Sequence, residues 1–126
     1  SDLRKFALKT ENRMDQIVRK ICIDLTSDLV RLTPVDTGLA RSSWFFGTFR
    51  KTDIGTDRVK SGSPSVVRSA EFAANLKAGG EFFITNNLPY IMQLEYGHSK
   101  QAPAGMARIT VDNWQHRVDR IARSLR

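Results

Sequence analysis

Apolar residues recur at steps of three and four through the amino-terminal part of the chain, from Leu3 to Leu32. This stripe consists of Phe6, Met14, Ile17, Val18, Ile21, Leu25, Leu29 and Leu32. Neither Gly nor Pro interrupts the segment, so the spacing predicts one long amphipathic α-helix whose apolar side covers a surface. The helix is expected to end at Thr33-Pro34, because proline disfavours helical geometry in the residue before it.

Two later segments are rich in aromatic and β-branched residues and predict short strands that pair with each other. The first is SWFFGTFRK at residues 43–51, and the second is EFFIT at residues 81–85. Between them, residues 50–65 are polar and predict a mobile, variable loop or an extended hairpin. Residues 66–76 then predict a short helix, whose apolar positions are Val67, Ala70, Phe72 and Ala74.

Two further helices are predicted in the carboxyl-terminal part of the chain. A short one runs from Pro89 to Gly97, with Tyr90 and Leu94 on its inner side. A surface loop at 98–102 leads to a longer amphipathic helix at about 105–125. Its apolar side consists of Met106, Ile109, Trp114, Val118, Ile121 and Leu125.

The length and the order of these elements predict the fold class. With 126 residues the chain fits one domain, 1–126, with the variable loop at about 50–65. We expect an α+β fold in which a small, mainly antiparallel sheet is packed by the long N-terminal helix and a C-terminal helix. No apolar run approaches the roughly 20 residues that cross a membrane, and the N-terminus lacks the pattern of a secretory signal. These features predict a soluble protein made in the cytosol.

The charge of +7 raises the possibility of nucleic-acid binding, since clustered cations release counterions from phosphates. The cations are nevertheless spread along the chain and are commonly accompanied by acids at helical spacing, as in Asp15 with Arg19. The denser local clusters are Arg4, Lys5 and Lys9 at one end of the chain and Arg117, Arg120, Arg123 and Arg126 at the other. Solvated helix faces and contacts with a nucleic acid or an acidic protein surface are therefore both open interpretations. The single Cys22 lies within the first apolar stripe and is expected to be a small buried hydrophobe.

The triplet Asp36-Thr37-Gly38 also occurs in aspartic proteases, where two aspartates share a proton. Here it follows the end of a predicted helix and not an apolar strand. We expect a turn in which the Asp36 carboxylate or the Thr37 hydroxyl accepts hydrogen bonds from the next N–H groups.

Glu95 and His98 are a second candidate for chemistry, as an acid–base pair or as metal ligands. A metal site normally needs three or four ligands, and the other histidine, His116, lies far along the chain. We expect Glu95 to pair with Arg41 and to fix a turn. The sequence also lacks a supported nucleophile and a phosphate-binding glycine loop, so it predicts no catalytic residue, no cofactor and no metal.

Prolines and glycines mark two rigid turns of the chain. One turn contains Pro34 and Gly38, and the other lies within Asn86 to Met106. The second contains Pro89, Gly97, Pro103 and Gly105.

Several segments together resemble the tail-completion and neck proteins, which join head to tail in long-tailed bacteriophages. These segments are TPVDTGLARSSW at 33–44, ITNNLPY at 84–90, LEYGHS at 94–99 and QAPAGM at 101–106. They occur in this order between an N-terminal and a C-terminal helix. The resemblance covers most of the chain except residues 50–76.

This resemblance implies a structural protein of the virion without enzymatic activity. It would form a ring, typically a hexamer, at the head-proximal end of the tail, and assemble in the host cytoplasm. Its partners would be copies of itself and adjacent head-closure, tail-terminator or tail-tube proteins, with genomic double-stranded DNA passing through the lumen without sequence readout. A tail-terminator ring and a small basic DNA-binding protein are the alternatives. The structural and interface candidates are Pro34, Asp36, Gly38, Arg41, Trp44, Pro89, Tyr90, Glu95, Gly97, Pro103 and Gly105.

Overall fold

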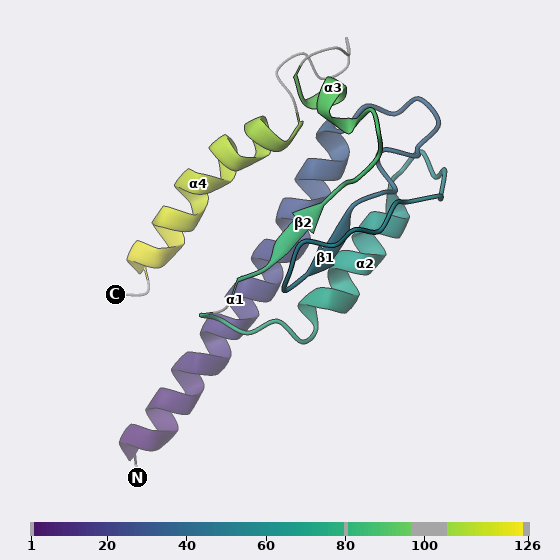
Figure 1. The fold of residues 1–126 in the computed structure, drawn as a ribbon. Helices are drawn as coiled ribbons and strands as arrows, with labels where there is room; N and C mark the ends of the chain where they lie inside the picture. The colour runs from purple at the N-terminus through teal and green to yellow at the C-terminus, as the bar shows by residue number, and fades with distance from the viewer. Residues whose placement is uncertain (1, 80, 97–105, 125–126) are drawn as a thin grey trace.

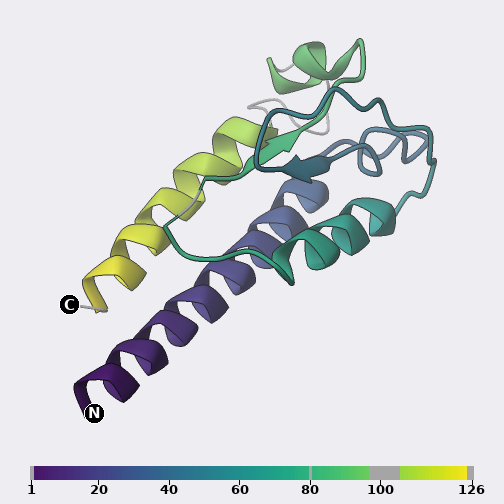
Figure 2. The same ribbon diagram turned by 60° about the horizontal axis from the view of Figure 1, so that its bottom comes forward.

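The long first helix is the axis of the molecule (Figure 1). The computed structural model describes residues 2–79, 81–96 and 106–124. In chain order the elements are α1 (Asp2–Leu32), β1 (Phe45–Gly47), α2 (Ser63–Ala73), β2 (Phe83–Thr85), α3 (Ile91–Glu95) and α4 (Met106–Ser124). Helices α2 and α4 lie on opposite sides of α1 in both Figure 1 and Figure 2. The predicted α+β class and the long N-terminal helix are confirmed. The predicted packing differs, because α2 contacts β1, whereas the C-terminal helix α4 contacts α1 and α3.

The two strands pair antiparallel, as predicted. Phe46 lies opposite Ile84, and both side chains contribute to the hydrophobic core. The first strand is shorter than the predicted 43–51 at both ends: it stops at Gly47, and it starts only at Phe45 because the chain is still turning before that residue. The N–H of Ser42 donates to the carbonyl oxygen of Gly38 at 3.0 Å, and that of Ser43 donates to Ala40 at 3.3 Å.

The core collects side chains from α1, β1, α2 and α4. Its buried members are Cys22, Leu29, Val30, Trp44, Phe46, Ala73, Leu76 and Met106. Burial raises the pKa of the Cys22 thiol to about 11 from its usual value of 9.0, because the thiolate loses its hydration. The expectation of a small buried hydrophobe at this position is confirmed.

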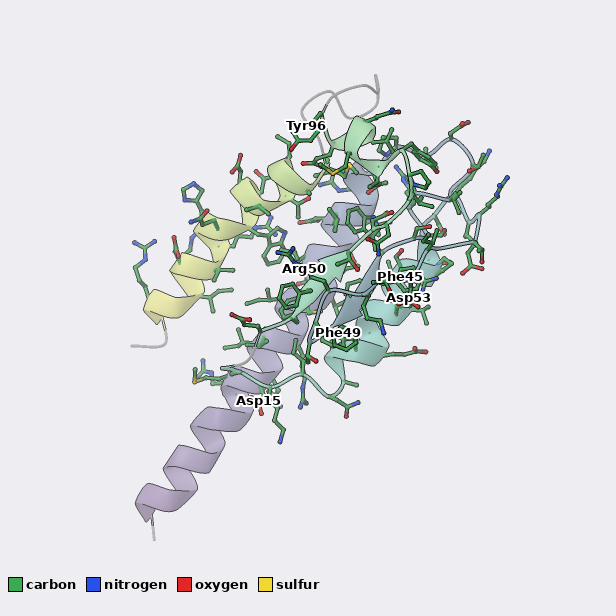
Figure 3. All side chains as sticks on the ribbon, in the orientation of Figure 1. Asp15, Phe45, Phe49, Arg50, Asp53 and Tyr96 are labelled. Carbon is green, nitrogen blue, oxygen red and sulfur yellow. The ribbon has the colours of Figure 1, made fainter. Side chains whose placement is uncertain are left out.

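Helix α1 ends where predicted, but two of its polar side chains have other partners than expected. Asp15, labelled in Figure 3, accepts a hydrogen bond from the backbone N–H of Ala78 at 2.8 Å. Arg19 donates from Nε to the carbonyl oxygen of Leu76, also at 2.8 Å. The predicted pairing between Asp15 and Arg19 is therefore wrong: both side chains hold the segment that follows α2.

Helix α2 begins three residues before the predicted 66–76. Ser65, Ser69 and Ala73 form its buried side. Of the four apolar positions named in the sequence, Phe72 packs against the core, whereas Val67 is 54% exposed and Ala70 and Ala74 are exposed as well.

Helix α4 lies beside α1 and runs in the opposite direction (Figures 1 and 2). Trp114 is buried between them, and its Nε1 donates to Oδ2 of Asp28 at 2.8 Å. The guanidinium of Arg117 lies 4.7 Å from the centre of the Trp114 ring and 3.7 Å from the same Asp28 oxygen. Further along, Val118 is 41% exposed, so the predicted apolar side of α4 is only partly covered.

Candidate functional site

Two segments that are distant in the sequence meet beyond the C-terminal end of α1. We call residues 33–44 together with residues 86–95 the corner. The side-chain amide of Asn86 donates from Nδ2 to the carbonyl oxygen of Ala40 at 3.0 Å. Its Oδ1 accepts the backbone N–H of Leu88 at 3.3 Å, and the Leu88 side chain is buried. One asparagine thus joins the two segments and shapes the turn that leads to α3.

Gly38 lets the first segment pass close to the loop that precedes α2. Its φ of +84° is in the left-handed region that favours glycine. A Cβ atom at this position would overlap the backbone of Val59 and Lys60. The adjacent Thr37 hydroxyl accepts the N–H of Leu39 at 3.3 Å, which confirms one of the two acceptors predicted for this turn. The other candidate, Asp36, has an exposed side chain.

The Arg41 side chain donates hydrogen bonds to three backbone carbonyl groups. Its Nε donates to the carbonyl oxygen of Thr33 at 2.6 Å, its Nη2 to that of Arg31 at 3.1 Å, and its Nη1 to that of Lys60 at 3.2 Å. Two of these oxygens belong to the end of α1, where helical carbonyls lack partners within the helix. The predicted pairing of Arg41 with Glu95 is wrong, because the guanidinium is bound to these carbonyl groups.

Trp44 and Ser65 connect the corner to α2. The Trp44 ring is buried, and its Nε1 donates to the hydroxyl of Thr33 at 3.3 Å. The Trp44 N–H donates to the hydroxyl of Ser65 at 3.1 Å, and that hydroxyl donates to the carbonyl oxygen of Arg41 at 2.7 Å. Pro34 is buried next to this network. These contacts fix the direction in which the chain leaves α1.

The loop at residues 48–62 lacks regular structure, as predicted, but it is anchored at several points. The Ser42 hydroxyl donates to the carbonyl oxygen of Val59 at 2.9 Å and accepts its N–H at 3.2 Å. Asn87 donates from Nδ2 to the carbonyl oxygens of Lys51 at 2.8 Å and Asp53 at 3.1 Å. The predicted mobile loop is therefore attached to both segments of the corner.

Arg68 of α2 fastens the same loop from the other side. Its Nη1 donates to the carbonyl oxygens of Ser42 at 2.7 Å and Trp44 at 3.1 Å, and its Nη2 lies 3.1 Å from Oδ2 of Asp57. Its guanidinium also lies 4.1 Å from the centre of the Phe45 ring. The sequence interpretation did not single out Arg68, because its partners are backbone oxygens that only the fold brings together.

A hollow of about 450 Å³ opens between the two segments of the corner. Pro34, Asp36, Gly38 and Leu39 line it from the first segment, and Tyr90 and Leu94 line it from the second. Arg58 of the loop contributes a cation. Five of the predicted candidates thus lie on or beside one surface: Pro34, Asp36 and Gly38, with Tyr90 and its exposed neighbour Pro89.

Glu95 caps the final helix. Its Oε2 accepts the backbone N–H of Ala107, in the first turn of α4, at 2.8 Å. A carboxylate at this end compensates unpaired N–H groups and the positive end of the helix dipole. The candidates Gly97, Pro103 and Gly105, and also His98, lie outside the described residues.

The outer side of the sheet carries aromatic rings and cations. Figure 3 labels Phe45, Phe49 and Arg50 in this region. Arg50 lies 5.8 Å from the centre of the Phe83 ring, and Lys51 lies 5.4 Å from that of Phe49. Phe49 is 63% exposed. This surface is suited to anions or to a protein partner.

Within the described residues, no three His, Cys, Asp or Glu side chains are grouped closely enough to hold a metal ion. None of the described helices is both long and apolar enough to cross a bilayer. Comparison of the chain with protein-family models, with curated proteins and with solved structures gave no match.

Proposed function

We propose that this chain is a structural, non-enzymatic subunit of the neck of a long-tailed bacteriophage. In this proposal it forms a ring at the head-proximal end of the tail and helps to join tail to head as a tail-completion protein. The observation that carries the proposal is the hydrogen bond between Asn86 and the carbonyl oxygen of Ala40, at 3.0 Å. It joins the two segments whose sequences resemble the neck family, so that they act as one structural unit.

The corner has the mechanical properties that a ring subunit needs. Load between neighbours has to be carried by parts whose relative angle does not change. Arg41 ties the end of α1 to the loop, Trp44 and Ser65 tie it to α2, and Glu95 ties α3 to α4. The hydrogen bonds of charged groups are the stronger ones in such a network, at about 1.5–3 kcal/mol each. The corner would therefore set the angle between α1 and α4 in every copy.

The hollow between the two corner segments offers a place for a neighbouring protein in the neck. It combines the apolar side chains of Pro34, Leu39 and Leu94 with one acid, Asp36, and one base, Arg58. Mixed surfaces of this kind are typical of interfaces between proteins. In the proposal, this hollow receives a residue of an adjacent layer such as the head-closure or tail-tube protein.

The proposal is tested in a phage that encodes this chain. If the chain is not made, lysates should contain filled heads and separate tails, and supplying the chain from a plasmid should restore joined particles. A plasmid copy with Asp36→Arg, which changes charge in the hollow, should restore fewer joined particles than the wild type. Joined, infectious particles without the chain would contradict the proposal.

One alternative is favoured by a specific observation. The charge of +7, together with Arg50 beside the half-buried ring of Phe83 and Lys51 beside the exposed ring of Phe49, suits a small DNA-binding protein. Within the C-terminal cluster, however, Arg117 is engaged with Trp114 and Asp28 of the same chain. Tight binding to duplex DNA that weakens steeply with salt, and that is lost in Arg50→Glu, would support this alternative.

A further inference from the structure

Helix α2 presents an apolar stripe to solvent. Val67, Ala70, Glu71 and Ala74 are all exposed, and of these four Glu71 alone carries a charge. Val67 is 54% exposed, and helical spacing places the two alanines beside it. We call these four residues the α2 face. The subunit leaves its three apolar side chains uncovered.

Hydrogen bonds on the opposite side of α2 explain why this stripe faces outward. Ser65 exchanges hydrogen bonds with the backbone of Trp44 and Arg41. Ser69 is fully buried, and its hydroxyl is satisfied within the helix by the carbonyl oxygen of Val66 at 2.7 Å. Turning Val67 inward would carry Ser65 away from Trp44 and Arg41 and leave their backbone groups without this partner, which costs roughly 1–3 kcal/mol for each group. The orientation of the α2 face is therefore fixed.

A groove of about 470 Å³ lies between α1 and α4. Its apolar lining is Ile17, Ile21, Trp114 and Ile121, and its charged lining is Lys20, Asp24, Arg117 and Arg120. We call it the α1/α4 groove. Lys20 lies 3.6 Å from Asp24 and Arg117 lies 3.7 Å from Asp28, and Arg120 adds a third cation to the groove. The groove is thus suited to an apolar surface that carries a carboxylate.

The α2 face and the α1/α4 groove complement each other in shape and in charge. The α2 face is an apolar ridge with one carboxylate, and the α1/α4 groove is an apolar furrow with a surplus cation. Pairing groove with groove would bring Arg120 toward other cations, and pairing two α2 faces would bring Glu71 toward Glu71. Contact between unlike faces avoids both repulsions.

We infer that the α2 face of one copy docks into the α1/α4 groove of a second copy, with Glu71 facing Lys20 and Arg120. The faces lie on opposite sides of α1 (Figures 1 and 2), so each copy can contact two neighbours in the same way. A repeated contact between unlike faces produces a ring when its rotation closes. The inference rests on the proposed function for closure into a ring, whereas the pairwise contact does not depend on it.

Charge reversal of the purified chain tests the contact. Glu71→Arg and Arg120→Glu should each weaken self-association about tenfold or more, since either one places like charges face to face. Mixing the two variants should restore assemblies that contain them in equal amounts, because each variant supplies the partner that the other needs. Sedimentation velocity measures the association, and native mass spectrometry measures the composition.

Two matched variants control for general changes in charge. Glu81→Arg and Arg123→Glu alter exposed residues outside both faces and should leave self-association unchanged. In a Cys22→Ala chain, the pair of substitutions Val67→Cys and Arg120→Cys should form a disulfide between copies. The pair Glu81→Cys and Arg120→Cys should not. This cross-link also reports a contact too brief for sedimentation to detect.

Four results would overturn the inference. They are a chain that neither associates nor cross-links at any concentration, association that Glu71→Arg leaves intact, equal weakening by the control variants, and failure of the mixed variants to recover. The proposed function can fail separately. If the purified chain associates through these faces, but the phage still joins heads to tails without the chain, the inferred contact stands and the proposed role in the neck is rejected.

Discussion

The side chain of Arg41 donates a hydrogen bond from Nε to the carbonyl oxygen of Thr33 at 2.6 Å, across the end of α1. The same guanidinium also donates hydrogen bonds to the backbone carbonyl oxygens of Arg31 and Lys60. Its planar fork presents several donors at fixed angles, whereas a lysine ammonium would reach only some of these oxygens. Arg41 therefore acts together with the contacts of Trp44 and Ser65 in fixing the angle between the first helix and the chain that follows.

Replacing this arginine by lysine keeps the positive charge but removes the planar set of N–H donors. We expect Arg41→Lys to lower the free energy of unfolding by about 1–3 kcal/mol, because carbonyl groups lose charged donors. Urea denaturation followed by circular dichroism measures the change. Arg123→Lys, an exposed change in α4, is the matched control and should stay within roughly 0.5 kcal/mol of the wild type. Equal effects of the two variants would refute the role of Arg41.

Two glycines with similar backbone angles separate steric overlap from conformational strain. Gly38 has φ +84° and Gly79 has φ +90°, but only Gly38 lies against other backbone atoms. Gly79→Ala should cost about 1 kcal/mol, from the left-handed conformation alone. Gly38→Ala should cost more, because the loop at Val59 has to move. Thermal unfolding of both variants measures the difference, and a Gly38→Ala chain as stable as Gly79→Ala would show that the loop is not held there.

The carboxylates of Asp36 and Glu95 should affect stability differently when each is replaced by its neutral amide. Glu95→Gln should destabilise the chain by about 0.5–1 kcal/mol, because it removes a charge from the start of α4. Asp36→Asn should change stability by less than roughly 0.5 kcal/mol, since this side chain is exposed. Denaturation of the two variants side by side checks the contrast. A larger loss for Asp36→Asn would mean that the corner depends on a contact of that carboxylate.

The Cys22 thiol predicts a specific dependence of stability on pH. Burial raises its pKa in the folded chain to about 11, while the unfolded thiol keeps a value near 9.0. Below pH 9 the thiol is protonated in both states, and between pH 9 and pH 11 the unfolded thiol loses its proton first. The thiol's contribution to stability is therefore present below pH 9 and is lost as pH rises toward 11.

Comparison with Cys22→Ala isolates this effect from other groups that titrate in alkali. The difference in unfolding free energy between wild type and variant should shrink as pH rises from 9 to 11. Alkylation of the native thiol should also be slow until the chain is unfolded by urea. A difference that stays constant over that range of pH would show that the thiol ionises as readily in the folded chain.

The long helices could be predicted from sequence because their apolar spacing repeats over many turns. Helix α1 ends before Pro34, and α4 begins next to the predicted boundary. Pairing of the two strands was predicted as well, since each is a short aromatic segment bounded by turn residues. The late start of β1 was not, because it depends on turn contacts of Ser42 and Ser43 after Gly38.

The direction of α2 and the partners of Arg41 could not be predicted from local pattern. Burial of Ser65 depends on Trp44 and Arg41, which lie far from it in the sequence. The sequence paired Arg41 with Glu95 as opposite charges, whereas the guanidinium binds carbonyl groups at the end of α1. Their need for donors, which every helix end shares, was the signal that could have identified the true partners of Arg41.

The central claim is that this chain forms a ring at the junction of head and tail, and imaging of the whole particle tests it most directly. Electron cryomicroscopy should compare particles from a phage that carries the wild-type chain with particles whose chain bears a compact tag. The account predicts additional tag density, repeated around the tail axis, in the layer between head and tail. Tag density elsewhere in the particle, or its absence from intact joined particles, would contradict the account.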